Sequence, residues 1–82
     1  MFNNVSKLIR EAREREGLSQ KEVATRLGYT SSQFISNIER GLCGIPEQQA
    51  RKFCDILRIA FTTTYIDAVI KDTRSRYVRL VA

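Results

Sequence analysis

The amino-acid sequence predicts an all-α protein, a compact bundle of about five helices. Two observations carry this prediction. Apolar residues recur at helical spacing along most of the chain, and Ser, Thr and Gly stand where those runs begin and end. With 82 residues, 43% of them hydrophobic, the chain has material for one small core. We therefore expect a single domain over residues 1–82, with the core in 1–60 and a C-terminal helix and tail in 61–82.

The first helix is expected over residues 4–16. Val5, Leu8, Ile9 and Ala12 follow the i, i+3, i+4, i+7 spacing of one apolar face. The opposite face is charged, as in a solvated helix. Gly17 closes the helix. Three residues compete for its N-cap position: Asn3, Asn4 and Ser6.

Two short helices joined by a tight turn are expected over residues 18–41. Ser19 and Glu22 have the spacing of a capping box, which starts the second helix. Leu18 and Val23 are placed to form a hydrophobic staple around that cap. Gly28 ends the helix, because a residue without Cβ adopts the left-handed conformation at little cost.

The third helix is expected to start at Ser31, with Thr30 as the other candidate cap, and to run to its C′ residue Gly41. Ile35 and Ile38 form its apolar stripe. The outward side carries short, uncharged side chains that donate and accept hydrogen bonds. These are Ser32, Gln33, Ser36 and Asn37. A merely solvated face more often carries Lys and Glu, so this face favours contact with another hydrogen-bonding surface.

Pro46 is expected at the first position of the fourth helix, where its missing N–H costs nothing. That helix ends near Arg58. Its apolar positions are Ala50, Phe53, Cys54 and Leu57.

The last helix has candidate caps in residues 62–64, which are Thr62, Thr63 and Thr64. Residues 77–81 are β-prone and alternate apolar with basic side chains. We expect helix to about Asp72, with a frayed or continuing helix beyond it.

The composition narrows the functional classes. Fourteen Lys and Arg residues against nine acidic ones give a net charge of +5, which favours a polyanionic partner but also fits simple solubility. No apolar run approaches the ~20 residues of a membrane span, and no secretion signal is present, so the expected location is the cytoplasm. The sequence has no His, phosphate-binding glycine loop or nucleophile–base pair, so we expect no enzyme, no cofactor and no small-molecule ligand.

The two cysteines do not form a metal site. Cys43 and Cys54, without any His, cannot supply the four ligands of a structural zinc. Cys54 is expected to pack as a small apolar residue. Cys43 lies in a probable loop, and a redox-sensing role remains its alternative.

A family resemblance extends these readings. The sequence is similar to the helix-turn-helix of the phage-repressor and Cro-like transcriptional regulators, the xenobiotic-response-element type, over residues 5–57. The matching segments are Ser19-Gln20, Val23-Ala24, Leu27-Gly28, Ile35-Ser36 and Ile38-Glu39-Arg40-Gly41. The turn after Gly28 holds one residue more than the commonest pattern, so the register of the third helix is counted back from Glu39.

The resemblance implies a lambda-repressor-like DNA-binding domain whose third helix enters the major groove of double-stranded DNA. The positions that face base edges are Ser32, Gln33 and Asn37, with Phe34 and Ser36 beside them. Packing within the domain is an almost equal alternative for Phe34. The positions that hold phosphates are Gln20, Ser31 and Arg40, while Arg10, Lys21 and Lys52 are weaker candidates that also fit plain solvated charges.

The resemblance also implies an ion pair between Arg13 and Glu39, which would tie the first helix to the third; the alternative is that Arg13 is one more surface arginine. It further implies a homodimer on a palindromic operator, because one helix reads too few base pairs. The expected dimer surface is a stripe on the last helix, and its alternative is that this stripe caps the monomer's own core. The stripe consists of Tyr65, Ile66, Val69, Ile70 and Tyr77.

Two competing classes remain. A protein-interaction module, such as an antitoxin, would use the same fold with an apolar outward face, whereas the face here is polar. An RNA-binding module would carry aromatic stacking platforms on the exposed helix. We therefore favour a transcriptional regulator that binds duplex DNA, and the resemblance implies a repressor.

Overall fold

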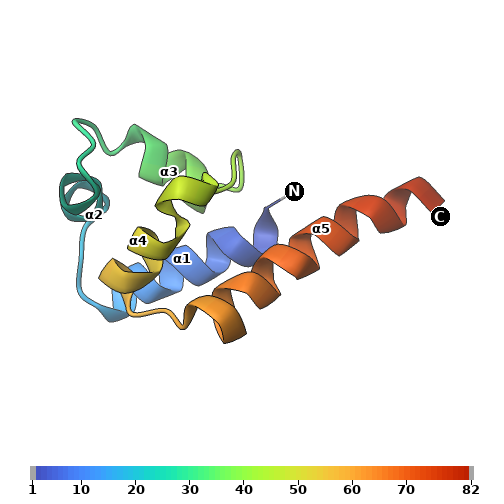
Figure 1. Ribbon diagram of the computed structural model, residues 1–82. Coiled ribbons are helices and arrows are strands. Elements are labelled where there is room, and N and C mark those ends of the chain that lie inside the picture. The colour runs from blue at the N-terminus through green and yellow to red at the C-terminus, as the bar shows by residue number, and fades with distance from the viewer. Residues whose placement is uncertain (1, 82) are drawn as a thin grey trace.

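The computed structural model describes residues 2–81, so Met1 and Ala82 of the predicted domain lie outside the described residues. The described part is helical, without strands, and the all-α prediction is confirmed (Figure 1). The elements are α1 (Asn3–Arg15), α2 (Gln20–Leu27), α3 (Gln33–Glu39), α4 (Glu47–Leu57), the π-helical turn η1 (Phe61–Tyr65) and α5 (Ile66–Val81).

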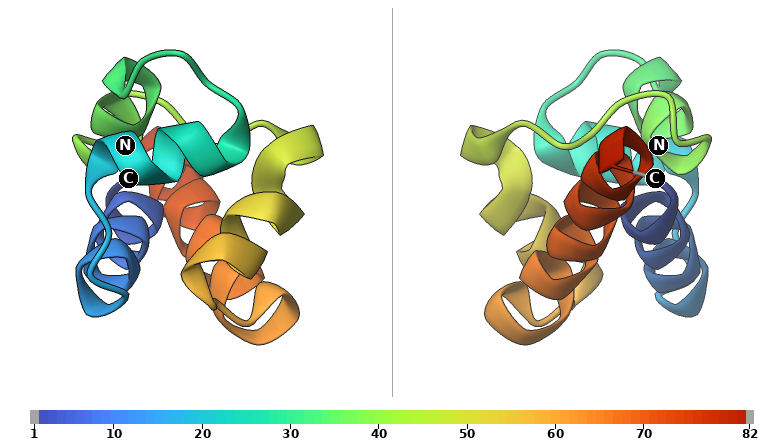
Figure 2. Two further views of the ribbon diagram at one scale, coloured as in Figure 1. Left: turned by 90° about the vertical axis from the view of Figure 1, so that its left-hand side faces the viewer. Right: turned by 90° about the vertical axis from the view of Figure 1, so that its right-hand side faces the viewer.

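The helices pack in two groups. α2 and α3 contact each other and form the upper part of the molecule in Figures 1 and 2, while α1 and α5 lie against each other below them. α4 contacts both α1 and α2 and so joins the two groups. The far end of α5 projects beyond the rest of the chain, which accounts for a longest dimension of 41 Å against 24 and 23 Å in the other directions.

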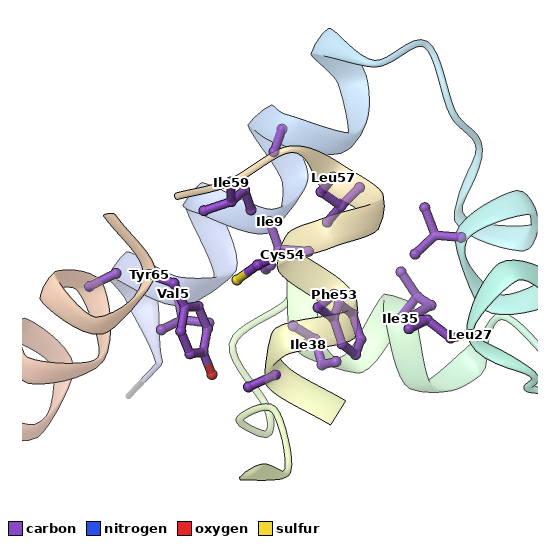
Figure 3. Close-up of a cluster of buried hydrophobic side chains, with 14 of the residues drawn as sticks. Val5, Ile9, Leu27, Ile35, Ile38, Phe53, Cys54, Leu57, Ile59 and Tyr65 are labelled. Atoms are coloured by element: carbon purple, nitrogen blue, oxygen red, sulfur yellow. The ribbon is translucent and has the colours of Figure 1, made fainter. Parts of the chain in front are cut away.

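The core lies where α1, α3 and α4 meet (Figure 3). Phe53, Ile9, Ile35, Ile38 and Leu57 are fully buried there. Each such side chain stabilises the fold by about 1.5–3 kcal/mol through the apolar surface that it removes from water. The apolar stripes of the separate helices therefore converge on one cluster.

The start and the end of α2 follow the predicted signals. The Ser19 hydroxyl accepts from the Glu22 backbone N–H at 3.0 Å, and the Glu22 carboxylate accepts from the Ser19 N–H at 2.9 Å. These bonds lower the pKa of Glu22 because they favour its ionised form. At the other end Gly28 adopts φ 90°, which a side chain would strain. The capping box and the glycine stop are confirmed.

The start of α3 differs from the prediction. The N-cap is Ser32, and the helix begins at Gln33 rather than after Ser31. The Ser31 hydroxyl instead accepts from the Gln33 N–H at 3.1 Å, so it satisfies the first helical donor from two residues away. The end matches: Gly41 has φ 75°, and its N–H donates to the carbonyl of Ile38.

Two further helix starts were predicted wrongly. Pro46 is the N-cap of α4 and not its first helical residue, because its ψ of 142° is extended. Residues 62–64 do not cap the last helix, because they lie inside η1, whose N-cap is Ala60. The Tyr65 N–H reaches the Ala60 carbonyl at 3.0 Å, the wider spacing of a π-helical turn. α5 then continues through the β-prone residues 77–81 as helix.

The start of α1 is capped from the other end of the chain. Its own N-cap, Phe2, offers no side-chain oxygen. The buried Asp72 of α5 accepts from the Asn4 N–H at 2.8 Å, the Asn4 side-chain amide at 2.9 Å and the Val5 N–H at 3.0 Å. The predicted caps Asn3, Asn4 and Ser6 therefore give way to a carboxylate 68 residues from Asn4.

The residues of the predicted apolar stripe on the last helix differ in their burial. Tyr65 is 5% exposed and belongs to the core, so for this residue the alternative, a place in the monomer's own core, is correct. Ile66 and Val69 are half-buried and pack against the same core. Ile70 and Tyr77, at 50% and 64%, remain exposed. Tyr77 lies on the part of α5 that projects beyond the other helices, whereas Ile70 is exposed although Asp72, two residues later, is buried against α1.

Candidate functional site

The outward side of α3 is polar. Ile35 and Ile38 point into the core, whereas Gln33 is exposed and Asn37 is half-buried one turn later. Ser36 on the same short helix and Ser32 at its N-cap are half-buried. The helix thus presents amides and hydroxyls outward while apolar side chains anchor it from behind.

Phe34 does not join this polar face freely. Its ring packs edge-on against Tyr29 with 5.2 Å between centroids, and both side chains lie against the core cluster. Such aromatic pairs contribute about 0.5–1.5 kcal/mol beyond their burial. The contact favours the packing alternative for Phe34 and braces the turn of residues 28–32 between α2 and α3.

Two amides on α3 are bonded to each other. The Gln33 Nε2 donates to Asn37 Oδ1 at 2.9 Å, across one helical turn. Exposed amide pairs at this spacing contribute only about 0.2–0.5 kcal/mol to the helix. The bond therefore contributes little to stability, and it joins two amides on the outward side of α3.

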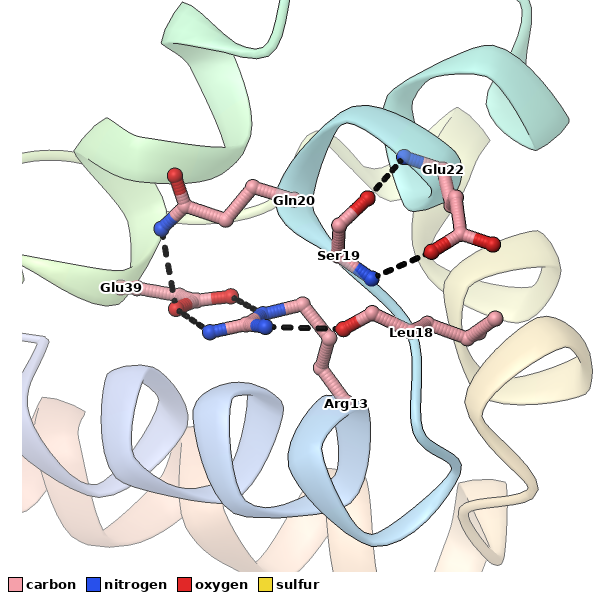
Figure 4. A network of polar contacts seen from close by, with 6 residues as sticks. All are labelled: Arg13, Leu18, Ser19, Gln20, Glu22 and Glu39. Carbon is pink, nitrogen blue, oxygen red and sulfur yellow. Dashed lines mark hydrogen bonds and ion pairs between the residues drawn. The ribbon is translucent and has the colours of Figure 1, made fainter.

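A charged network joins α1, α2 and α3 (Figure 4). Arg13 Nε lies 2.6 Å from Glu39 Oε2, and Arg13 Nη2 lies 3.0 Å from Oε1, so the predicted ion pair is present and bidentate. Arg13 Nη1 also donates to the Leu18 carbonyl at 2.8 Å, just before the start of α2. Hydrogen bonding to Glu39 raises the pKa of Arg13, so the guanidinium stays charged.

Glu39 has a second partner that the sequence did not reveal. Its Oε1 accepts from Gln20 Nε2 at 3.2 Å, and its side chain is only 4% exposed. The local spacing carries no signal for this contact, because 19 residues separate the two positions. The carboxylate therefore orients the Gln20 amide at the first residue of α2 relative to α3.

The predicted phosphate-binding residues surround α3 on the surface. Ser31 and Arg40 are exposed at its two ends, and Lys21 is exposed beside Gln20. Arg10 is exposed on α1, on the same face as Ser6 and Arg13. Ser6 lies beside Gly41, which follows α3. Lys52 is exposed on a different helix, α4. All but Lys52 thus lie on elements that border the polar face.

Neither cysteine has the environment of a reactive thiol. Burial raises the pKa of Cys43, and it raises the pKa of Cys54 to about 11, so both thiols are protonated at neutral pH. This argues against the redox-sensing alternative for Cys43. Among the described residues, His, Cys, Asp and Glu side chains do not gather into a group of three that could hold a metal. Across residues 2–81 every helix is too short or too polar to cross a bilayer.

Comparison with known proteins identifies the unit formed by α2 and α3. A family model described as a helix-turn-helix domain matches residues 5–60, which is more than half of the chain. The chain belongs to the helix-turn-helix domain family. This family is one of binding domains and not of enzymes, and α2, the turn 28–32 and α3 are its helix-turn-helix in this protein.

A solved structure shares the fold of this helix-turn-helix domain. The crystal structure of the clp gene regulator ClgR from Corynebacterium glutamicum matches with a TM-score of 0.71 over 98% of this chain and 88% of that one. The sequence identity is 18%, so this likeness establishes the fold alone. No curated protein sequence matches the chain.

Proposed function

We propose that this helix-turn-helix domain binds double-stranded DNA in a sequence-specific way and regulates transcription in the cytoplasm. The observation that carries the proposal is the outward face of α3, where Gln33 and Asn37 present amides from a helix anchored by buried Ile35 and Ile38. The major groove is about 12 Å wide and admits one helix. Amide side chains are the ones that pair with adenine edges there.

The residues around α3 suit contacts with the DNA backbone. The Ser31 hydroxyl accepts from Gln33, so its own O–H is left to donate to a phosphate. Gln20 Nε2 gives one N–H to Glu39 and keeps a second for the same purpose. Arg40, Lys21 and Arg10 add positive charge at the border of the face, in keeping with the net charge of +5. Phosphate contacts of this kind position the domain, while base contacts specify the site.

The competing class is a protein-interaction module, such as an antitoxin. Such a module needs an apolar docking face, and the one large apolar side chain on this side of α3, Phe34, is engaged with Tyr29. The remaining side chains are hydroxyls and amides. The chemistry of this face therefore favours DNA.

We further propose that the protein acts as a repressor in the form of a homodimer on a palindromic operator. One α3 reads only a few base pairs, and two copies related by a two-fold axis double the site. The recognition helices would then lie about 34 Å apart, one turn of DNA. The exposed Ile70 and Tyr77 on the projecting α5 support this arrangement, because a second α5 would cover them.

Two substitutions separate base reading from backbone binding. Gln33→Ala should weaken binding to a selected operator by about 1–3 kcal/mol and leave binding to random duplex nearly unchanged. Arg40→Ala should weaken both and reduce the salt slope by about one unit. Titration of each variant at several salt concentrations measures both effects. Arg58→Gln is the charge control, because Arg58 ends α4 on the side away from α3 (Figures 1 and 2). Equal binding of wild type to operator and random DNA would contradict sequence-specific recognition.

A further inference from the structure

The outward side of α5 carries the residue spacing of a coiled-coil seam. The seam consists of Ile66, Ile70, Thr73, Tyr77 and Leu80, which follow one another at alternating intervals of four and three residues. Its exposure rises along the helix, from half-buried Ile66 to 50% at Ile70 and 78% at Leu80. The buried Asp72 marks a different side of α5, the one that packs against α1. From Ile70 onward the seam is therefore a largely apolar surface that the chain's own core does not cover.

One flank of this seam carries opposite charges. Asp67 and Arg74 each directly follow a seam residue and are seven residues apart, so they occupy the same position of the heptad. Both are exposed, and two turns of helix, about 10 Å, separate them along α5. Asp67 pairs with Lys71 at 3.0 Å, a surface contact that contributes little to stability. A second helix laid along the seam can bring the charges of Asp67 and Arg74 together.

The two charges favour an antiparallel pair of helices. Helices packed in opposite directions place the same heptad position of both chains on one side of the seam, so Asp67 of one copy can lie opposite Arg74 of the other. Helices packed in the same direction bring this position against the other flank of the seam, where Val69 and Arg76 lie. The antiparallel arrangement therefore pairs the opposite charges, and a two-fold axis forms the contact twice.

The same charges favour one register. Antiparallel registers that keep the seam together differ by seven residues. In one of them Ile70 lies opposite Thr73 of the second copy, and Asp67 then meets Arg74. A shift by seven residues in either direction brings Asp67 against Asp67, or Arg74 against Arg74. Like charges at these flanks act against pairing, so the first register is favoured.

The surface beside the start of α5 has room for the partner helix in this register. A groove of about 380 Å³ lies between α5 and the start of α4. Its apolar lining includes Ile45, Phe61, Ile66 and Val69. The register places Tyr77 of the second copy opposite Ile66, at this groove. The projecting end of each α5 would therefore rest on the other chain and fill its groove.

We propose that a second copy of this chain packs its α5 antiparallel against the first, with Ile70 opposite Thr73 and with reciprocal ion pairs between Asp67 and Arg74. This inference rests on the proposed homodimer. It goes beyond that homodimer because it assigns the orientation, the register and the two charged residues that select them. The groove between α4 and α5 belongs to the interface and receives the projecting end of the other copy.

Charge reversal tests the reciprocal ion pairs. Asp67→Arg places Arg against Arg at both contacts of the homodimer, and Arg74→Asp places Asp against Asp. Each variant should weaken the homodimer by about tenfold at low salt, because two attractions become two repulsions. An equimolar mixture of the two variants should form a heterodimer about as tight as the wild-type dimer, because every contact again joins opposite charges. Both substitutions in one chain should restore the homodimer for the same reason.

Sedimentation equilibrium gives the affinities, and native mass spectrometry with one isotope-labelled partner identifies the heterodimer. Lys52→Asp and Asp55→Arg are the matched controls. They reverse the same kinds of charge at exposed positions of α4 outside the groove, so the dimer should be unchanged. Circular dichroism checks that each variant stays helical.

Arg74→Lys covers the case in which a reversal unfolds the chain, because this substitution keeps the charge. Carbodiimide couples carboxylates to amines, so it should join Asp67 of one copy to position 74 of the other. A mixture of labelled and unlabelled protein distinguishes this crosslink from one within a single chain.

The outcomes separate this inference from the proposed homodimer. A wild type that is monomeric at tens of micromolar would end both. A wild-type dimer that both reversals leave intact, or weakened variants that form no heterodimer when mixed, would overturn the antiparallel register and leave the homodimer standing. Crosslinks of Arg74→Lys confined to single chains within a dimer would overturn the register as well.

Discussion

A single carboxylate, that of Glu39, holds three helices in register. It binds Arg13 of α1 through both oxygens and Gln20 of α2 through one, while its own backbone belongs to α3. Only 4% of the Glu39 side chain and 15% of the Arg13 side chain are exposed, so both charged groups are largely desolvated. Such a pair is costly to break, because the remaining charge is then buried without a partner.

Glu39→Ala should therefore lower the free energy of unfolding by about 3 kcal/mol, because it leaves the Arg13 guanidinium buried without its charged partner. Urea denaturation followed by circular dichroism measures the loss. Replacing both partners, Arg13→Met with Glu39→Leu, should cost less than Glu39→Ala alone, because no unpaired charge remains. Glu11→Ala, at an exposed position of α1, is the control and should stay within about 0.5 kcal/mol. A double variant less stable than the single one would refute this account.

Arg58 is a residue whose backbone is strained. It ends α4 with φ 55°, a left-handed conformation that a side chain disfavours, and its ion pair with Glu16 at 3.5 Å is 81% exposed on the Arg58 side. Surface pairs of this kind contribute little.

Arg58→Gly should raise the free energy of unfolding by about 0.5–1 kcal/mol, because relief of the left-handed strain exceeds the entropy that glycine adds to the unfolded chain. Thermal melting gives the sign directly. The reverse change at the end of α2, Gly28→Ala, should destabilise, because there φ is 90°. Stabilisation by both substitutions, or by neither, would show that the left-handed conformation is not the source of the effect.

At the scale of elements, α1 and α5 depend on each other through Asp72. The carboxylate takes three donors at the first turn of α1, where orphan N–H groups and the positive end of the helix dipole favour an anion. The first and last helices are thereby fastened together. α5 can project at its far end because its near end is held here.

Asp72→Ala should reduce stability by about 1–3 kcal/mol, the cost of a lost cap whose donors are partly buried. Hydrogen exchange should show the loss first in the backbone amides of Asn4 and Val5. Asp67→Ala on the same helix is the matched control: Asp67 is 55% exposed and forms a surface pair with Lys71, so its loss should cost about 0.5 kcal/mol or less. Equal effects of the two substitutions would argue against the capping role.

At the scale of the whole molecule, most of the large exposed apolar side chains of the described residues lie on α5, and Leu42 is the exception. Ile70, Tyr77 and Val78 are half or more exposed, and Leu80 and Val81 are exposed at 78% and 86%. Residues nearer the start of the helix pack against the chain's own core. A dimer surface on α5 is therefore expected from Ile70 onward rather than around Tyr65.

Ile70→Asp combined with Tyr77→Asp should convert the proposed dimer to a monomer without unfolding it, because both side chains are exposed in one chain and desolvated only by a second. Sedimentation gives the mass, and operator titration should show half-site binding alone. Ile66→Asp is the contrast: Ile66 packs on the core, so this charge should lower the melting temperature. A wild type that sediments as a monomer at tens of micromolar and binds one protomer per operator would refute the dimer.

Much of this fold can be predicted from the local sequence. The capping box at Ser19, the glycine stops and the periodic apolar positions depend on neighbours within one helical turn, so they were predicted with errors of only a few residues at helix starts. The family resemblance supplied the Arg13–Glu39 pair, which spacing alone does not reveal. The outward register of Gln33 and Asn37 also followed from periodicity, because residues four apart share a face.

Only the tertiary structure decided how these pieces act on one another. The cap of α1 comes from Asp72, and the partner of Gln20 is Glu39, because packing places atoms within hydrogen-bond reach at sequence separations of 68 and 19. Tyr65 and Tyr77 belong to the same apolar stripe, yet one is buried and the other exposed. Periodicity defines the face of a helix, but whether a point on that face meets core or solvent depends on where the neighbouring helices end.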